Sequence, residues 1–188
     1  HTLENHGEVH VDEGSKVVLE EGAGALNNTG TLWLDSGVIE LWGGPAQAQG
    51  AGRVLGTGQV RIPLTVDMIQ DIQDQVYTGN QITPAVSVKP QTMWDFTANY
   101  ANAADYTVTG YSNNIHVGTA TANVAPVAGG QLLDKGTVGK SFQIVPASYT
   151  MAVTNTLTVR EGEADLLTKL NALVSTNPQD VLAQGTMS

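Results

Sequence analysis

The chain has 188 residues, and 8 Lys+Arg against 18 Asp+Glu give it a formal net charge of −10. This charge disfavours nucleic acid as a partner, because an acidic surface repels phosphate groups. Cysteine is absent, which excludes disulfides and Cys-based zinc sites, and no apolar run approaches the ~20 residues that a membrane-spanning helix needs. With 21 Gly, 5% aromatic and 14% charged residues, the composition is typical of β-rich extracellular or virion-surface proteins.

An internal repeat opens the chain. The segments 5–14 and 28–37 share the pattern N-x-G-x-Φ-x-Φ-D-x-G, where Φ is apolar, so the pattern that starts at Asn5 starts again at Asn28. Short alternating segments lie at 16–19, 37–41 and 58–62. Alternation with a period of two, bounded by Gly and Asn, predicts short strands with tight turns. The repeat resembles the coils of parallel β-helices in bacterial surface adhesins and phage tailspikes, and a Greek-key or hairpin stack is the alternative.

The repeat is too short to close itself. A solenoid has a core only where repeats stack, so two to three coils cannot bury their own ends. We therefore expect a preceding coil, a cap or a partner chain there. Residues 43–52 are small and show no periodicity, which predicts a loop.

The pattern changes at Ile69, where a second resemblance begins. Residues 71–88 are similar to the opening of the MBG/YDG-type repeat modules of large bacterial surface proteins. Residues 105–121 resemble that family's D-Y-x-V-x-Y-x-N-N-x-x-x-G-T-A-x motif, and residues 139–144 resemble its closing piece. The resemblance covers about residues 69–146 and implies a small all-β module of immunoglobulin-like or β-grasp-like fold.

Two segments, 91–104 and 125–136, depart from the pattern of that family, so we expect a specific function to have been added there. The first contains Trp94, Phe96 and Tyr100. Aromatic side chains are favoured at recognition surfaces because they bury a large area at low entropic cost. These three residues are our candidate contacts to a glycan or a partner, and packing in the core is the alternative.

The C-terminal part is predicted to contain a hairpin and a helix. A strand at 149–153 is expected to pair with 156–159, and acids at 163–165 favour a helix start after it. A helix this short must pack on something, so we assign its apolar face as a candidate oligomer contact, with its own domain as the alternative. The face consists of Leu166, Leu167, Leu170, Leu173 and Val174.

The predicted fold class is therefore all-β, with one short C-terminal helix. A β-helix-like repeat segment occupies 1–66, an MBG-like β module 67–148, and the hairpin and amphipathic helix 149–188.

Several polar residues near the N-terminus are of the types that bind metal ions in proteins. His6, Glu8, His10 and Asp12 alternate on one strand face, and Asp12, Glu13, Glu20, Glu21 and Asp35 lie near turns. We interpret the first set as a solvated strand face, because no further ligand is visible. The second set lacks a D-x-D-x-D-G loop, so we predict no metal or other cofactor, with structural calcium as the alternative.

No catalytic residue is predicted. Asp105, Ser112 and His116 are the residue types of a catalytic triad, but they lie inside the family's structural motif and outside any nucleophile elbow. We therefore expect the protein not to be an enzyme.

The function expected from these observations is that of a structural or adhesive subunit of an extracellular or virion-surface assembly. A phage fibre or decoration protein and a bacterial surface fibre both fit this description. The expected partners are copies of the chain, as a trimer or polymer, and capsid or surface-layer subunits, without nucleic acid and without a membrane span. A carbohydrate-binding module of a surface adhesin or tailspike, with glycans as ligands, is the alternative.

Overall fold

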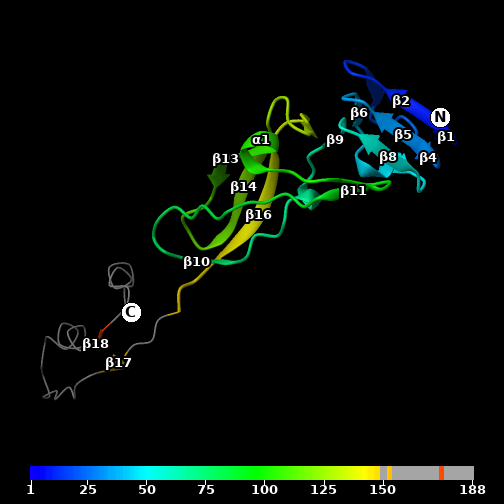
Figure 1. Ribbon diagram of the computed structural model, residues 1–188. Coiled ribbons are helices and arrows are strands. Elements are labelled where there is room, and N and C mark those ends of the chain that lie inside the picture. Colours follow the sequence, from blue (N-terminus) through cyan, green and yellow to red (C-terminus); the bar gives the residue numbers. More distant parts are fainter. Residues whose placement is uncertain (149–151, 154–173, 176–188) are drawn as a thin grey trace, which may run out of the picture.

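The computed structural model describes residues 1–148, 152–153 and 174–175. Their secondary structure is mostly β, which confirms the predicted all-β character (Figure 1). Two assemblies of strands follow one another along the chain, and they share one hydrophobic core.

The first assembly consists of three parallel sheets, and each pass of the chain contributes one strand to each sheet. We call each pass a rung. Rung 1 contains β1 (Leu3–Asn5), β2 (Glu8–Val11) and β3 (Lys16–Leu19). Rung 2 contains β4 (Leu26–Asn28), β5 (Thr31–Leu34) and β6 (Val38–Leu41). Rung 3 contains η1 (Pro45–Gln47), β7 (Ala48–Gln49), β8 (Arg53–Gly56) and β9 (Gln59–Pro63).

The offset of the sequence repeat is also the register of the first two strand pairs between rungs 1 and 2, whereas β3 pairs with β6 at a spacing one residue shorter. Glu8 pairs with Thr31 and Val11 with Leu34, at the same spacing that separates the two copies of the repeat. All the strand pairs between rungs are parallel. Equivalent side chains therefore stack in columns that form the core. One such column is Val17, Ile39 and Val60, of which the last two are fully buried.

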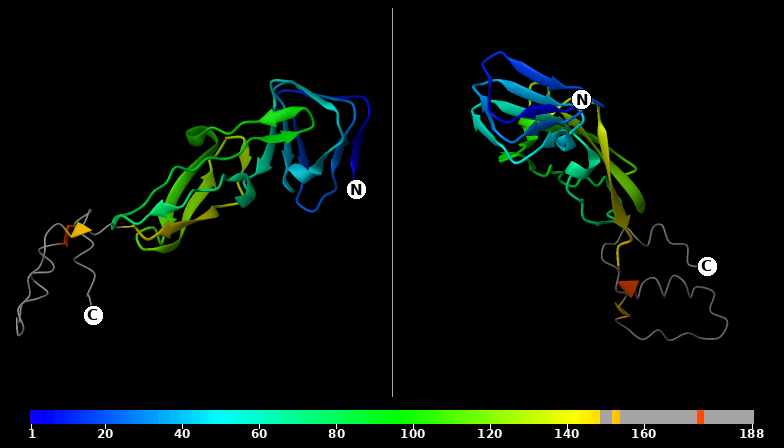
Figure 2. Two further views of the ribbon diagram at one scale, coloured as in Figure 1. Left: turned by 90° about the horizontal axis from the view of Figure 1, so that it is seen from below. Right: turned by 90° about the vertical axis from the view of Figure 1, so that its right-hand side faces the viewer.

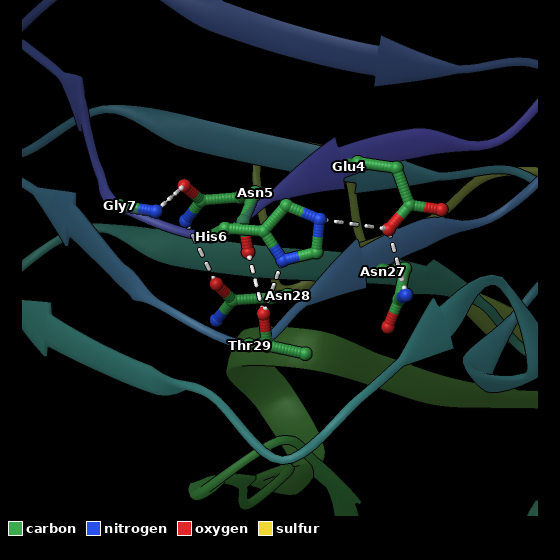
Figure 3. A network of polar contacts seen from close by, with 7 residues as sticks. All are labelled: Glu4, Asn5, His6, Gly7, Asn27, Asn28 and Thr29. Carbon is green, nitrogen blue, oxygen red and sulfur yellow. Dashed lines mark hydrogen bonds and ion pairs between the residues drawn. The ribbon is translucent and has the colours of Figure 1, made fainter.

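A buried amide ladder connects the rungs at the corner after β1 and β4 (Figure 3). The Asn5 Nδ2 donates to Asn28 Oδ1 at 2.8 Å, and Asn28 Nδ2 donates to the Arg53 carbonyl at 3.2 Å. Buried amides are costly unless they are bonded, so these contacts explain why both repeats begin with Asn.

The second assembly is a four-stranded sheet in the order β10-β16-β14-β13. Its strands are β10 (Gln75–Val76), β13 (Tyr106–Ser112), β14 (Gly118–Pro126) and β16 (Val138–Val145). The long strands β13, β14 and β16 pair antiparallel, whereas β10 pairs parallel to β16. The helices η2 (Val66–Met68) and α1 (Asn102–Asp105) lie between strands in the sequence.

The segment that crosses this sheet at 77–88 is held by tyrosines from β13. Tyr106 donates its hydroxyl to the Val86 carbonyl at 3.2 Å and accepts the Val88 N–H at 3.3 Å, and Tyr111 donates to the Pro84 carbonyl at 2.6 Å. Burial raises the pKa of both phenols, which keeps them as donors. Around Pro84, which has no N–H for strand pairing, side chains thus supplement the backbone bonds that Tyr77, Ile82 and Ser87 make to neighbouring segments.

Two local predictions were wrong. The predicted loop at 43–52 contains β7, which pairs with β4, because backbone pairing in a stacked rung does not require apolar alternation. Val174 was predicted to lie on a helix face, but it belongs to the strand β18 (Val174–Ser175), which pairs with β17 (Ala152–Val153). A β-branched residue favours a strand over a helix, which the apolar spacing did not take into account. The other four residues of that face, and the expected partner strand at 156–159, lie outside the described residues.

We expect the amide ladder to contribute strongly to stability. The substitution Asn28→Ala removes the acceptor of the 2.8 Å bond from Asn5 and the side-chain donor to the Arg53 carbonyl, so the free energy of unfolding should fall by about 1–3 kcal/mol. Its neighbour Asn27 is the matched control, because its amide bonds only the exposed Glu4 carboxylate. Asn27→Ala should change stability by less than about 0.5 kcal/mol. Urea titration measures both, and equal losses would contradict the ladder's role.

Candidate functional site

An aromatic hairpin covers the edge of rung 3 that faces away from rung 2 (Figures 1 and 2). It consists of β11 (Gln91–Met93) and β12 (Phe96–Ala98), which pair antiparallel around Trp94 and Asp95. The Trp94 indole donates to the Gln49 carbonyl at 2.6 Å, and the Val54 N–H donates to Asp95 Oδ1 at 2.6 Å. These bonds satisfy the Gln49 carbonyl of β7 and the Val54 N–H of β8, which lie on the side of rung 3 that faces away from rung 2.

A second segment closes the same edge at β9. The strand β15 (Leu132–Leu133) pairs parallel to β9, so the third sheet is continued by residues that lie far away in the sequence. The Arg61 guanidinium donates to the Gly130 carbonyl, with Nε at 2.9 Å, and Lys135 forms an ion pair with Glu21 at 2.7 Å. The two insertions of the sequence, 91–104 and 125–136, therefore both contact the rungs.

Trp94 occupies an unusual backbone conformation. Its φ is 55°, in the left-handed region where a bulky residue is strained by about 1–3 kcal/mol. The hydrogen bond to Gln49 and the packing of the ring on the shared core compensate for this cost. The hairpin is thus shaped to place the indole on rung 3.

The three aromatic candidates lie within one segment and are all half-buried. Trp94, Phe96 and Tyr100 pack against the core that joins the two assemblies. The Tyr100 hydroxyl is the one buried side-chain polar atom without a partner among the described residues. Desolvation, and next the nearby charge of Asp105, raise the pKa of Tyr100. The ring thus remains neutral and packs as an apolar group.

The predicted metal-binding residues are only partly brought together. His10, Asp12 and Asp35 place one ligand atom each within 4.8 Å of one another, and all three side chains are exposed. His10 stacks on Trp33, with centroids 6.0 Å apart, and its Nδ1 lies 3.8 Å from Asp35 Oδ2. This arrangement could hold a cation, yet its residues come from different sequence sets, His10 from the strand face and Asp35 from the turn acids.

The other candidate ligands have different neighbours. His6 Nδ1 lies 2.7 Å from the Thr29 hydroxyl, and its Nε2 is 3.8 Å from Glu4 (Figure 3). Glu8 lies at 4.0 Å from His10, outside the three-residue cluster. Glu13 and Glu20 are exposed, and Glu21 binds Lys135 as described above.

Asp105 serves the backbone. Its carboxylate accepts the Ala101 N–H at 2.6 Å and the Gln131 N–H at 2.9 Å, and the residue is buried. Ser112 accepts the Asn123 amide at 3.3 Å, and His116 is exposed in the β13–β14 connection. The acid of the hypothetical triad is therefore engaged in holding two loops.

The contacts that the sequence did not indicate are those that join the assemblies. Asp95, Gln49 and Arg61 carry no motif and bond across 41 to 69 residues of sequence. An apolar pair at 132–133 within a Gly-rich insertion was the only available signal for β15.

Three comparisons with known proteins, against family models, curated proteins and solved structures, found no match. In the part of the chain that the structure describes, none of the helices has the length and apolar character needed to cross a membrane.

We expect the Trp94 indole bond to hold the hairpin on rung 3. Trp94→Phe keeps most of the ring but removes the donor, so the free energy of unfolding should fall by about 1 kcal/mol. The Val54 amide should exchange with solvent faster, because Asp95 is then held less firmly. Trp33→Phe, whose ring stacks on His10, is the matched control and should leave Val54 exchange unchanged. Unaltered exchange in Trp94→Phe would contradict this interpretation.

Proposed function

We propose that the protein is a non-enzymatic structural or adhesive subunit of an extracellular or virion-surface assembly, either a phage fibre or decoration protein or a bacterial surface fibre. The observation that carries the proposal is the use of buried polar side chains. Among the described residues, each buried Asn, Gln, Asp and Glu bonds the scaffold itself, through backbone groups or other scaffold side chains, while the Tyr100 hydroxyl stays unbonded. The bonded residues are Asn5, Asn28, Glu40, Gln47, Asp105 and Asn114.

Gln47 and Glu40 illustrate this use. The Gln47 amide accepts the Gly43 N–H at 2.7 Å and donates to the Glu20 carbonyl at 2.9 Å, which fixes the corner between rungs. Glu40 lies between Lys16 at 3.1 Å and Arg61 at 3.7 Å, one cation on each neighbouring rung. Such groups specify the stacking register and leave few of the interior charges available for chemistry.

The proposal includes a β-helix-like repeat and an MBG/YDG-type module. Parallel rungs that follow the offset of the sequence repeat support the first. For the second, the support is that the motif at 105–121 lies on β13 and β14, and the closing piece at 139–144 on β16, so that all motif strands pair in one sheet. Both kinds of unit are associated with surface fibres, on which the proposed location rests.

Self-association is part of this proposal, as a trimer or polymer, with capsid or surface-layer subunits as further partners. The proposed contact is the apolar pattern of 166–173, which lies outside the described residues and rests on sequence alone. We expect Leu170→Asp combined with Leu173→Asp to convert the oligomer to monomers, because two buried carboxylates would oppose association.

Sedimentation velocity of the full chain measures the change, and circular dichroism should show the β spectrum retained. Asp replacements at the exposed Thr2 and Thr57 provide a charge-matched control, which should remain oligomeric. An unmodified chain that sediments as a monomer at all concentrations would contradict the proposal.

The second candidate function is glycan binding, favoured by one observation: Trp94, Phe96 and Tyr100 are half-buried and gather in one segment. Stacking of sugar rings needs such partly accessible aromatic faces. The three aromatics line neither of two surface hollows, one of which includes Gln70, Gln73 and Ser87 and the other Gly24, Gln47 and Gln49. Because the Trp94 indole N–H already binds the Gln49 carbonyl and the three rings pack on the core, the structural proposal is the stronger.

A glycan array distinguishes the two functions. For a structural subunit we expect no glycan to bind the full-length protein above background. Reproducible binding that is lost in Phe96→Leu, and kept in the control Phe142→Leu on the far sheet, would favour the carbohydrate-binding module and overturn the structural proposal. Circular dichroism should verify that both variants are folded.

A further inference from the structure

The outer edge of rung 1 exposes side chains that are core elsewhere. Leu3 is 54% exposed, whereas its partner in the next rung, Leu26, is 2% exposed. Val9 is 39% exposed, and its partner Leu32 is 1% exposed. Two apolar columns therefore continue to this edge and end there uncovered, whereas the columns that end in Val11 and Leu19 stay buried.

The glycines of rungs 2 and 3 show how closely one rung packs on the rung before it. A Cβ on Gly30 would overlap the backbone of Gly7, and one on Gly37 would overlap the carbonyl of Val11. Gly52 repeats the first position in rung 3, where a Cβ would strike Asn28 at its side-chain amide. These positions must lack a side chain because the preceding rung lies directly on them.

Rung 1 has glycine at the first of these positions without that reason. Gly7 is the equivalent of Gly30, yet a Cβ at Gly7 would meet nothing within 4 Å, whereas Ser15 occupies the position opposite Gly37. Gly7 also lacks the positive φ that would by itself favour glycine. The space above Gly7 thus matches the backbone that lies above Gly30.

The amide ladder is also open in this direction. Asn28 Oδ1 accepts from the Asn of the preceding rung at 2.8 Å. Asn5 Oδ1 accepts only the Gly7 N–H, at 3.1 Å, so one of its two lone pairs is free for an equivalent donor. An incoming amide would extend the ladder by one step.

The opposite edge is not available to a second copy. In the described residues, the edge of rung 3 that faces away from rung 2 is occupied by Trp94 on β7, Asp95 on β8 and β15 on β9. A copy stacking head to tail in the parallel register would have to displace all three contacts. The surface that packs on the outer edge of rung 1 must therefore belong to another rung, one whose edge facing rung 1 is not covered.

We propose that the outer edge of rung 1 is a docking site for one further rung of the same repeat, joined to the N-terminal side of His1 and carrying Asn above Asn5. The contact continues the rung-to-rung interface already present: parallel strands above β1, β2 and β3, and a backbone carbonyl above Gly7. This inference holds whether or not the protein proves to be a surface subunit, because it concerns only the stacking of rungs.

The test is an extended protein, in which a second copy of residues 1–23 precedes His1 of the full chain. We expect the backbone amides of β1 to β3 to exchange with solvent at least about tenfold more slowly than in the original chain. A control extension of the same composition, with its sequence scrambled, should give no such protection.

Gly7→Ala separates docking from general stability. In the original chain it should leave the urea midpoint unchanged, because its Cβ meets open space. In the extended protein it should abolish the protection, because the Cβ would then strike the added rung. Gly30→Ala in the original chain is the positive control and should lower the urea midpoint, because the clash is already present there.

Three results would overturn the proposal. One is equal protection by the scrambled extension, and another is a Gly7→Ala substitution that leaves the protection intact. The third is sedimentation evidence that the original chain dimerises and that Gly7→Ala prevents it, because the edge would then be an interface between copies. None of these results depends on glycan binding or on the surface location, so they are distinguishable from a failure of the proposed function.

Discussion

The structure depends on how the backbone edge of rung 3 is satisfied. Parallel strands stacked in rungs leave a row of N–H and C=O groups at each end, and such edges invite association with other chains. Here a strained hairpin and a two-residue strand close one edge, by Trp94 on the Gln49 carbonyl, Asp95 on the Val54 N–H and β15 on β9. The same contacts give the second sheet a fixed place against the rungs, so one set of bonds both caps the repeat and unites the core.

Polar side chains decide the register in which the rungs stack. Apolar columns alone would tolerate a slip, since Val, Leu and Ile are interchangeable in shape to within a methyl group. Asn5 above Asn28, and Glu40 between Lys16 and Arg61, permit only one alignment, because a slip would leave buried amides or a buried carboxylate without partners. The scaffold therefore uses its buried polar groups for specificity.

Local spacing predicted the features that arise from local pairing. The offset between the repeats at 5–14 and 28–37 is the register in which β2 pairs with β5, because strands one pass apart carry the same pattern of side chains. The hairpin at 91–98 was marked as an insertion with three candidate aromatic contacts, and the strand at 132–133 only as part of an insertion. Their partners in the rungs, Gln49, Val54 and the strand around Ile62, are distant in the sequence and contribute backbone groups that carry no signature there. β7 was missed because Ala48 and Gln49 pair through their backbone alone. For the candidate cation site, Asp12 was grouped once with His10 and once with Asp35, but that His10 and Asp35 meet follows only from the parallel register of β2 and β5.

The two ends of the rung stack now have different physical characters. At rung 3 the apolar columns end under Trp94, Met93 and Leu132, which are at least half-buried and join the shared core. At rung 1 two of them end in exposed Leu3 and Val9, with a glycine at position 7 that its own surroundings do not require. Since an apolar face costs free energy when it meets water, the stack has a direction in which it can grow and a direction in which it is closed. A chain built in this way can terminate an array of rungs, because the insertions of its second sheet occupy the surface on which another rung would stack.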